Sequence, residues 1–261
     1  MLRQSFIFLP GVGEHRERQL WQRVADWNSF LDAKRLPGFS ERIKHGHDQT
    51  ILRLKDAIYA DDTAALANAF PSVEHWRMYP DYRDEAAFLD IETGPAGDVS
   101  MVGVFDGRET KTFVQGVNLD RQTLLDELQR YKLLVTFNGK SFDVPVLKRW
   151  FRLPFTMPHV DLRHVCASIG LTGGLKTIEK TMDIKRPESI KHVTGQDAAE
   201  LWRCWKATRD KDFFDMLVTY NEEDCVNLKT IADRVVPQLW NSVRRKDVVV
   251  GKFPENSPQH T

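Results

Sequence analysis

Two acids within an apolar run are the first residues of this sequence whose types and spacing suggest chemistry. Asp90 and Glu92 follow Phe88 and Leu89 and are separated by a single apolar residue, Ile91. In an extended strand this spacing places both carboxylates on one face, while Leu89 and Ile91 point into a core. Two like charges on one face repel, so the pair is tolerable mainly when cations lie between the carboxylates. Taken alone, the pair fits a half-buried strand with a polar outer face equally well.

A third acid, Asp143, follows a short apolar segment. Residues 133–137 are apolar throughout, as expected for a strand buried on both faces, and an Asn-Gly turn leads from them to Asp143. Loops at the ends of such strands are places where α/β sheets collect ligands. The alternative is that Asp143 only caps the helix that it begins, and Pro145 in the first turn supports that boundary.

A fourth acid lies on a long helical pattern over residues 213–236. Tyr220 and Asp224 are four residues apart, so on a helix they share a face with Leu217 and Leu228, which should pack inward. An acid on an apolar face is costly unless it has a partner or a metal. The alternative for Tyr220 is an ordinary core tyrosine with a satisfied hydroxyl group.

The elements that would position these residues form an α/β pattern from residue 86 onward. Four strands are expected, and an amphipathic helix separates the last two. The strands cover residues 88–92, 98–106, 109–115 and 133–137, and the helix covers residues 119–131. Strands first in a meander and then alternating with helices predict a mixed sheet.

The N-terminal part has a helical pattern instead. Helices are expected over residues 14–26, 27–36, 40–60 and 62–70, and the Pro-containing, charged residues 71–85 indicate a linker. The turn Pro10-Gly11-Val12-Gly13 resembles the hairpin of helix-hairpin-helix modules, which binds a DNA phosphate. Because residues 5–9 look extended and no helix precedes the turn, a plain helix-capping turn is favoured over a phosphate site.

Bulk properties restrict the class of protein. The 261 residues carry no net charge, which argues against a surface that grips nucleic acid over its whole area but allows local basic patches. The three cysteines form no CxxC pair, which excludes a cysteine zinc site and fits a reducing compartment. The sequence has no apolar run long enough to span a membrane and no cleavage pattern of a signal peptide. A cytoplasmic protein is therefore expected.

Taken together, the motifs resemble those of a known nuclease family. In order and type, Asp90-x-Glu92, Asn138-x-x-x-Phe142-Asp143 and Tyr220-x-x-x-Asp224 are similar to the three motifs of the DEDDy exonucleases, which have an RNase-H-like fold. The closest resemblance is to the YprB-type branch, through residues 88–93, 135–143, 159–162 and Leu175-Lys176-Thr177-Ile178-Glu179. The resemblance covers about residues 86–240, and each motif alone is weak, but three in order are specific.

The resemblance implies a fold, a reaction and a ligand set. The fold would be an RNase-H-like α/β domain, a mixed sheet with helices on both faces, plus a small helical N-terminal region. The reaction would be metal-dependent 3′ to 5′ hydrolysis of phosphodiester bonds at single-stranded DNA or RNA ends. Two divalent cations, Mg²⁺ or Mn²⁺, would be held by Asp90, Glu92, Asp143 and Asp224, and Tyr220 would orient or help to deprotonate the attacking water.

Further residues are assigned by the same resemblance. Those expected to line the path of the terminal nucleotides are Asn138, Gly139, Lys140 and Ser141. Thr93 and Gly94 are expected to let the backbone approach a sugar or base. Asp161 matches a recurrent residue of the family, but it is expected to cap the following helix over residues 162–169.

Other polar and aromatic residues have simpler explanations. For Lys176 and Lys180, solvation is favoured over phosphate contact, and Trp202 and Trp205 are expected to pack a helix rather than stack on bases.

The predicted organisation has three parts. They are a helical N-terminal region with the hairpin-like turn and the linker at 1–80, an RNase-H-like exonuclease domain at 81–245 and a C-terminal tail at 246–261. A second functional hypothesis is a nucleic-acid-binding module that keeps a nuclease fold but has negligible catalysis.

Overall fold

A mixed five-stranded sheet forms the centre of the computed structural model, which describes residues 1–245. Its strands are β1 (Ala86–Thr93), β2 (Val99–Phe105), β3 (Thr110–Val114), β4 (Leu133–Thr136) and β5 (His159–Asp161), in the order β3-β2-β1-β4-β5. The first three strands form an antiparallel meander, whereas β4 pairs in parallel with both β1 and β5. The predicted tail at 246–261 lies outside the described residues.

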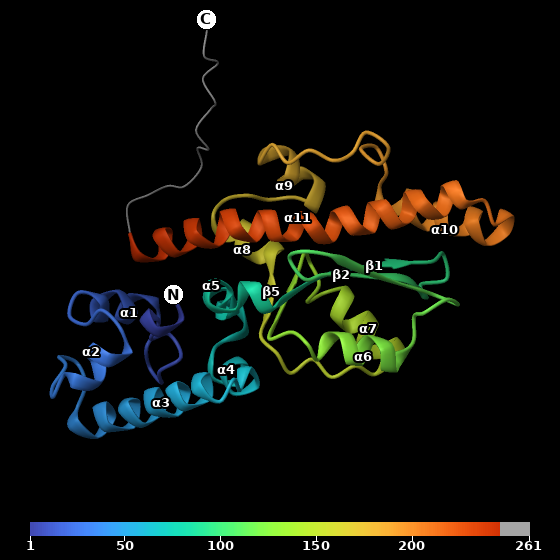
Figure 1. Cartoon of the computed structure of the whole chain (residues 1–261). Helices are drawn as coiled ribbons and strands as arrows, with labels where there is room; N and C mark the ends of the chain where they lie inside the picture. Colours follow the sequence, from blue (N-terminus) through green and yellow to red (C-terminus); the bar gives the residue numbers. More distant parts are fainter. Residues whose placement is uncertain (246–261) are drawn as a thin grey trace, which may run out of the picture.

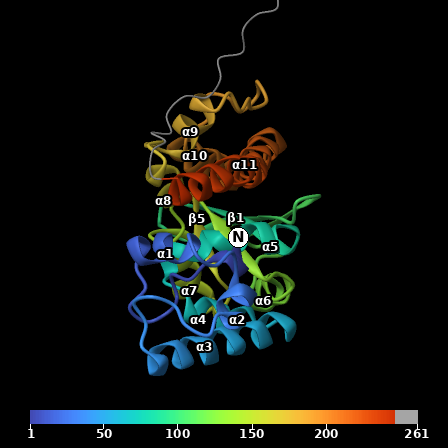
Figure 2. The same ribbon diagram turned by 90° about the vertical axis from the view of Figure 1, so that its left-hand side faces the viewer.

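Helices cover both faces of this sheet (Figures 1 and 2). One face packs against α6 (Arg121–Leu128) and α7 (Asp143–Phe151). The other packs against α8 (Leu162–Ser168), α10 (Gly195–Thr208) and the 34-residue α11 (Lys211–Arg244), with α9 (Leu175–Thr181) beside α11. The RNase-H-like α/β fold expected from the resemblance is thereby confirmed, together with the additional helical region at the N-terminus.

Strand β1 has two different faces, as its alternating sequence predicts. Leu89 and Ile91 join the core beneath α6 and α7. Phe88 points to the opposite face and packs with residues of α8 and α11. Because side chains alternate along a strand, Asp90 and Glu92 lie on the same face as Phe88, toward α11.

Helix α11 crosses the sheet at a glycine. Gly103 of β2 pairs with Asp90 of β1, and a Cβ atom at Gly103 would lie 2.2 Å from Asn221 Oδ1 and 2.7 Å from Cys225 Sγ. Any side chain at this position would therefore push α11 away from the sheet. The close approach brings one face of α11 onto the acidic end of β1.

The N-terminal region is helical and packs against the sheet domain (Figure 1). Its helices are α1 (Glu14–Trp21), α2 (Trp27–Asp32), α3 (Glu41–Tyr59) and α4 (Thr63–Ala69), preceded by the short 3₁₀ helix η1 (Leu2–Gln4). Ser5 is extended, but residues 7–8 form a turn and residue 9 a bend, so the expected strand over residues 5–9 does not form. Apart from three-residue η1, no helix of the described chain precedes the Pro10–Gly13 turn.

The interpretation of residues 71–85 as a linker is wrong. They form η2 (Ser72–Met78), α5 (Tyr79–Tyr82) and η3 (Arg83–Glu85). Trp76, Met78 and Tyr79 are buried in the same core as β1 and α11, and the Trp76 ring lies 6.3 Å from that of Trp240. Its two prolines and many charges resembled a linker, but its aromatic residues tie the N-terminal region to the sheet.

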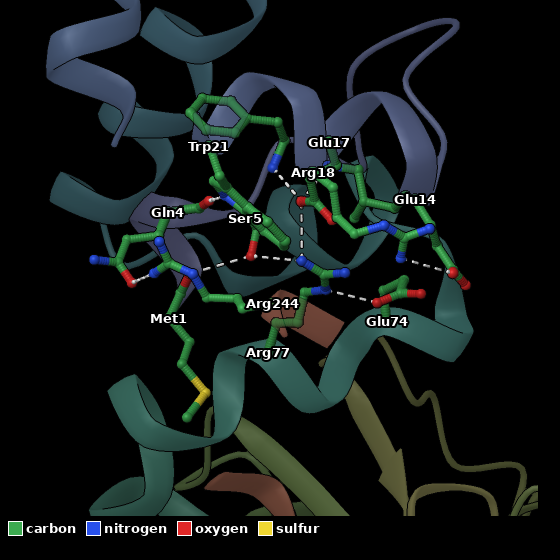
Figure 3. Close-up of polar contacts among 12 residues, drawn as sticks. Met1, Gln4, Ser5, Glu14, Glu17, Arg18, Trp21, Glu74, Arg77 and Arg244 are labelled. Carbon is green, nitrogen blue, oxygen red and sulfur yellow. Dashed lines mark hydrogen bonds and ion pairs between the residues drawn. The ribbon is translucent and has the colours of Figure 1, made fainter. Parts of the chain in front are cut away.

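A buried ion pair reinforces this junction (Figure 3). Arg77 Nη1 donates to Glu17 Oε1 at 2.9 Å, and Arg77 also pairs with Glu74. The same Glu17 oxygen accepts hydrogen bonds from the backbone N–H groups of Phe6 and Ile7. One carboxylate thus holds the first turns of the chain, α1 and η2 together.

No helix within residues 1–245 is long and apolar enough to cross a membrane.

Candidate metal centre and active site

Three carboxylates from distant segments meet at the carboxyl end of β1. One oxygen from each of Asp90, Glu92 and Asp224 lies within 4.8 Å of the others. The first two come from alternate positions of β1, and the third comes from the face of α11 that crosses the sheet at Gly103. The structure therefore brings together two of the sequence motifs that are separated by more than half of the chain.

Asp143 lies next to this group and is fixed by β1 itself. Its Oδ1 accepts a hydrogen bond from the Ile91 N–H at 3.2 Å, between the two strand acids. It is the first residue of α7 and an acid in the first turn of that helix, as the capping alternative expects, but it makes no side-chain cap hydrogen bond there. Its carboxylate is buried but is not one of the group whose oxygens lie within 4.8 Å of one another.

Helix α11 supplies a further contact that the sequence analysis did not single out. Asn221 Nδ2 donates to Asp90 Oδ2 at 2.9 Å and to Asp90 O at 3.3 Å. The amide therefore holds both the carboxylate and the backbone of the first strand acid. Its position directly after Tyr220 in the third motif was the only signal in the sequence.

Like charge and burial dominate the electrostatics of the centre. Burial, together with the neighbouring carboxylates, raises the pKa of Asp90 and that of Glu92 well above the usual value. Burial raises the pKa of Asp143 to about 7 and that of Asp224 to about 6, although Arg186 opposes the shift at Asp224. The acids thus keep their protons to a higher pH than isolated carboxyl groups do, unless cations neutralise them.

Tyr220 is buried one helical turn before Asp224. Burial and the charges of Asp224, Glu92 and Asp90 raise the pKa of its hydroxyl group. The phenol is consequently neutral at pH 7, when it can donate a hydrogen bond.

Two cations from the segment around α9 face the acids. Arg186 pairs with Glu179 through Nε and Nη2, at 2.7 and 2.6 Å, and its Nη2 also contacts Asp224. Glu179 accepts a further hydrogen bond from Asn227 Nδ2 at 3.0 Å. Lys176, for which solvation was favoured, has its ammonium nitrogen covered and 5.0 Å from the centre of the Tyr220 ring. That interpretation of Lys176 is wrong, while Lys180 is exposed as expected.

The donor set fits a hard divalent cation. The clustered atoms are carboxylate oxygens, the ligands that Mg²⁺ and Mn²⁺ prefer, and no His or Cys of the described residues joins the cluster. Close packing of several buried acids is unfavourable without such a cation, as their raised pKa values indicate.

The turn after β4 carries four of the residues predicted to contact substrate. Asn138 has the left-handed backbone that asparagine tolerates, with φ of 66°, and its N–H donates to Asp161 Oδ1. Gly139 approaches Thr136 so closely that a Cβ atom would lie 2.2 Å from Thr136 Oγ1. The conformation of this turn therefore depends on the asparagine and the glycine.

The side chains of this turn differ in direction. Lys140 Nζ donates to the carbonyl of Ser72 at 2.7 Å, so its charge is directed to η2 rather than left free. Asn138 Oδ1 accepts from Arg163, and Ser141 is exposed. Asp161 caps α8 as expected, because it accepts from the Arg163 N–H, and it also accepts from the Lys140 N–H.

Thr93 and Gly94 lie where β1 leaves the sheet. The pairing with β2 shifts register between Glu92 and Thr93. A Cβ atom at Gly94 would lie 2.8 Å from Asp98 Oδ1 and 3.2 Å from Trp202 Cδ1, which gives this glycine a packing role. Trp202 is buried against α11, so its expected packing role is confirmed.

A known protein family matches more than half of the chain. Residues 87–236 match a family of the RNase_H superfamily. The corresponding comparisons with curated proteins and with solved structures gave no significant match. The matched segment begins in β1 and ends within α11, so it contains all four acids and Tyr220.

Proposed function

Because this chain belongs to the RNase H superfamily, we propose that it is a nuclease of the DEDDy type that removes nucleotides in the 3′ to 5′ direction. The observation that carries the proposal is the convergence of Asp90, Glu92 and Asp224 within 4.8 Å, with Tyr220 one turn before Asp224. The YprB-type branch is the proposed place within the superfamily. Residues 81–245 are the proposed exonuclease unit, and single-stranded 3′ ends of DNA or RNA are the proposed substrate.

The proposed metal ligands are Asp90, Glu92, Asp143 and Asp224. Divalent cations bound there would supply an activated water and neutralise the charge that develops on the phosphate during in-line attack. The hydrogen bonds from Asn221 to Asp90 and from Ile91 N–H to Asp143 would keep these two carboxylates oriented. Preorganised ligands reduce the cost of assembling the site for each reaction cycle.

Tyr220 is proposed to orient the attacking water. Its raised pKa favours a neutral hydroxyl group over a phenolate, which supports hydrogen bonding rather than proton abstraction. Among the other residues proposed to contact the strand, Asn138, Gly139 and Ser141 lie on the turn before α7, and Thr93 and Gly94 lie at the end of β1. Lys140 is proposed to contact the strand only if its bond to Ser72 opens.

The test is a gel assay with end-labelled single-stranded DNA and RNA in Mg²⁺ or Mn²⁺. A 5′ label should give a ladder of shortened strands, whereas a 3′ label should appear first as a mononucleotide. Asp90→Asn and Asp224→Asn should each reduce the rate by roughly 100-fold or more. Asp215→Asn is the matched control, because this exposed acid of α11 pairs with Lys211 alone among the residues that the structure describes.

The alternative is a module that binds nucleic acid without cutting it. It would be favoured if the wild-type protein binds the strands and leaves them intact with either metal. Equal degradation by wild type and Asp90→Asn would instead assign the activity to a contaminant and reject the proposed active site.

A further inference from the structure

Two cations flank the ring of Tyr220 in the candidate active site. Lys176 Nζ lies 5.0 Å and Arg186 Cζ 5.4 Å from the ring centroid. Lys176 belongs to α9, and Arg186 follows it in the segment that leads to α10. Both therefore stand beside the carboxylates without being part of the predicted metal-ligand set.

Each of these cations has a buried nitrogen atom without a hydrogen-bond partner. Within residues 1–245, Lys176 Nζ and Arg186 Nη1 are covered from solvent and donate to no atom. The Arg186 side chain is only 5% exposed. Burying cationic donors without acceptors is costly, because the water that they lose is not replaced. An anion with several oxygens would satisfy both.

The orientation of Arg186 is fixed by its other contacts. Glu179 binds Nε and Nη2 in the two-pronged geometry that matches a carboxylate, and Asn227 holds Glu179 from α11. Since Asp224 also contacts Nη2, only Nη1 is left for a ligand. The guanidinium is thus held in place with one buried donor nitrogen, Nη1, left unpaired.

Neutralising the acids does not use the N–H donors of Lys176. The charge of Lys176 lowers the pKa of Glu92, but its ammonium group makes no hydrogen bond with any acid among the described residues. Its buried position costs solvation, which lowers its pKa. The feature that it shares with Arg186 is an unused donor beside Tyr220.

We propose that Lys176 and Arg186 form a receptor for one backbone phosphate of the bound strand, beside the carboxylates. This inference rests on the proposed function in that it takes the ligand to be a nucleic-acid strand. A phosphodiester offers two anionic oxygens, one for each free donor. Arginine and lysine are the residues that bind phosphate most often, and Lys176 would act as a point charge next to the oriented Arg186.

The test is a thermodynamic cycle of binding affinities, in which the charge of Lys176 or Arg186 and the charge of one backbone phosphate are removed separately and together. A fluorescein-labelled single-stranded oligodeoxynucleotide is titrated in Ca²⁺, and its integrity is checked on a gel. In a series of oligonucleotides of the same sequence, each phosphate linkage near the 3′ end is replaced in turn by a neutral methylphosphonate. The proteins compared are wild type, Lys176→Met, Arg186→Lys and the control Lys180→Met, an exposed lysine one turn along the same helix.

The contribution of one phosphate linkage to binding should depend on the presence of Lys176. Its neutralisation should weaken binding to wild type by roughly ten-fold, and Lys176→Met should weaken binding of the charged strand to a similar extent. Combining the two changes should cause little further loss, because each removes the same contact. Arg186→Lys should weaken binding through the same phosphate linkage, while Lys180→Met should bind the strand as wild type does. Melting curves show whether each variant is folded.

The phosphate receptor would be overturned if, at every linkage, the loss of affinity from the methylphosphonate added fully to the loss from Lys176→Met. The gel assay with Mn²⁺ separates this failure from failure of the proposed function. If wild type shortens the strand and no linkage is coupled to Lys176, the proposed nuclease is supported and the phosphate receptor is rejected. If a linkage is coupled to Lys176 and the strand stays intact, the receptor is supported and the proposed exonuclease is rejected.

Discussion

Arg77 Nη1 lies 2.9 Å from Glu17 Oε1, and the two side chains are 1% and 0% exposed. The pair joins η2 to α1 in the interior of the protein, where neither charge is stabilised by water. Burial raises the pKa of Glu17 although Arg77 opposes the shift. Because each charge compensates for the burial of the other, removing one leaves an uncompensated ion in the core.

Arg77→Met should therefore destabilise the protein by about 3–5 kcal/mol. The loss is measured by urea denaturation followed by circular dichroism. Arg18→Met is the matched control, since Arg18 pairs with Glu14 near the surface and should contribute less than about 1 kcal/mol. Equal losses for the two variants would argue against an important buried pair.

Gly103→Ala should separate α11 from the sheet. The new methyl group would lie 2.2 Å from Asn221 Oδ1, so the helix must move, at a cost of about 1–3 kcal/mol. Because Asn221 also holds Asp90, cleavage should fall more than stability does. Gly46→Ala is the control: a methyl group on this exposed glycine of α3 would have no atom within 4 Å, and the change should stabilise the helix by about 0.5–1 kcal/mol. Unchanged cleavage by folded Gly103→Ala would contradict this explanation.

Asp143→Asn should change stability in a pH-dependent way. Burial raises the folded-state pKa of Asp143 from 3.8 to about 7, so the folded protein retains a proton that the unfolded chain loses. Its contribution is present at low pH and is lost as the pH rises toward 7. In EDTA the melting temperature of the variant should therefore exceed that of wild type by more at pH 8 than at pH 5. A variant that is less stable than wild type at pH 8 would reverse the predicted sign.

Tyr220→Phe should reduce kcat by about 100-fold with little change in KM, because the hydroxyl group is proposed to act on the attacking water rather than on strand binding. The phenyl ring keeps its packing, so the melting temperature should stay close to that of wild type. Initial rates over a range of oligonucleotide concentrations separate the two parameters. A large rise in KM with unchanged kcat would instead assign Tyr220 to strand binding.

The alternation of β1 was sufficient to predict which side chains share a face. Leu89 and Ile91 enter one core, while Asp90 and Glu92 point to the other side, because a strand has a period of two. The same reasoning placed Tyr220 and Asp224 on one face of α11. Where a residue lies within a regular element, the period of that element determines its direction.

Arg186 could not be found in this way. It lies in an irregular segment, 38 residues from Asp224, so no period relates the two positions. The buried segment around Trp76 was missed for a different reason. Its prolines and charges are typical of linkers, whereas its burial depends on packing against Trp240, more than 160 residues later in the chain.

A single helix connects the acidic centre with the N-terminal region. Helix α11 contains 34 residues, about 50 Å of continuous helix, and carries Asp224 in its first half and Trp240 near its end. Trp240 packs against Trp21 and Trp76, at ring distances of 5.5 and 6.3 Å. The two regions should accordingly unfold in one cooperative transition. A fragment that starts at residue 81 would lack Trp21 and Trp76 and would leave the ring of Trp240 exposed. We therefore expect such a fragment to aggregate rather than to yield a smaller active enzyme.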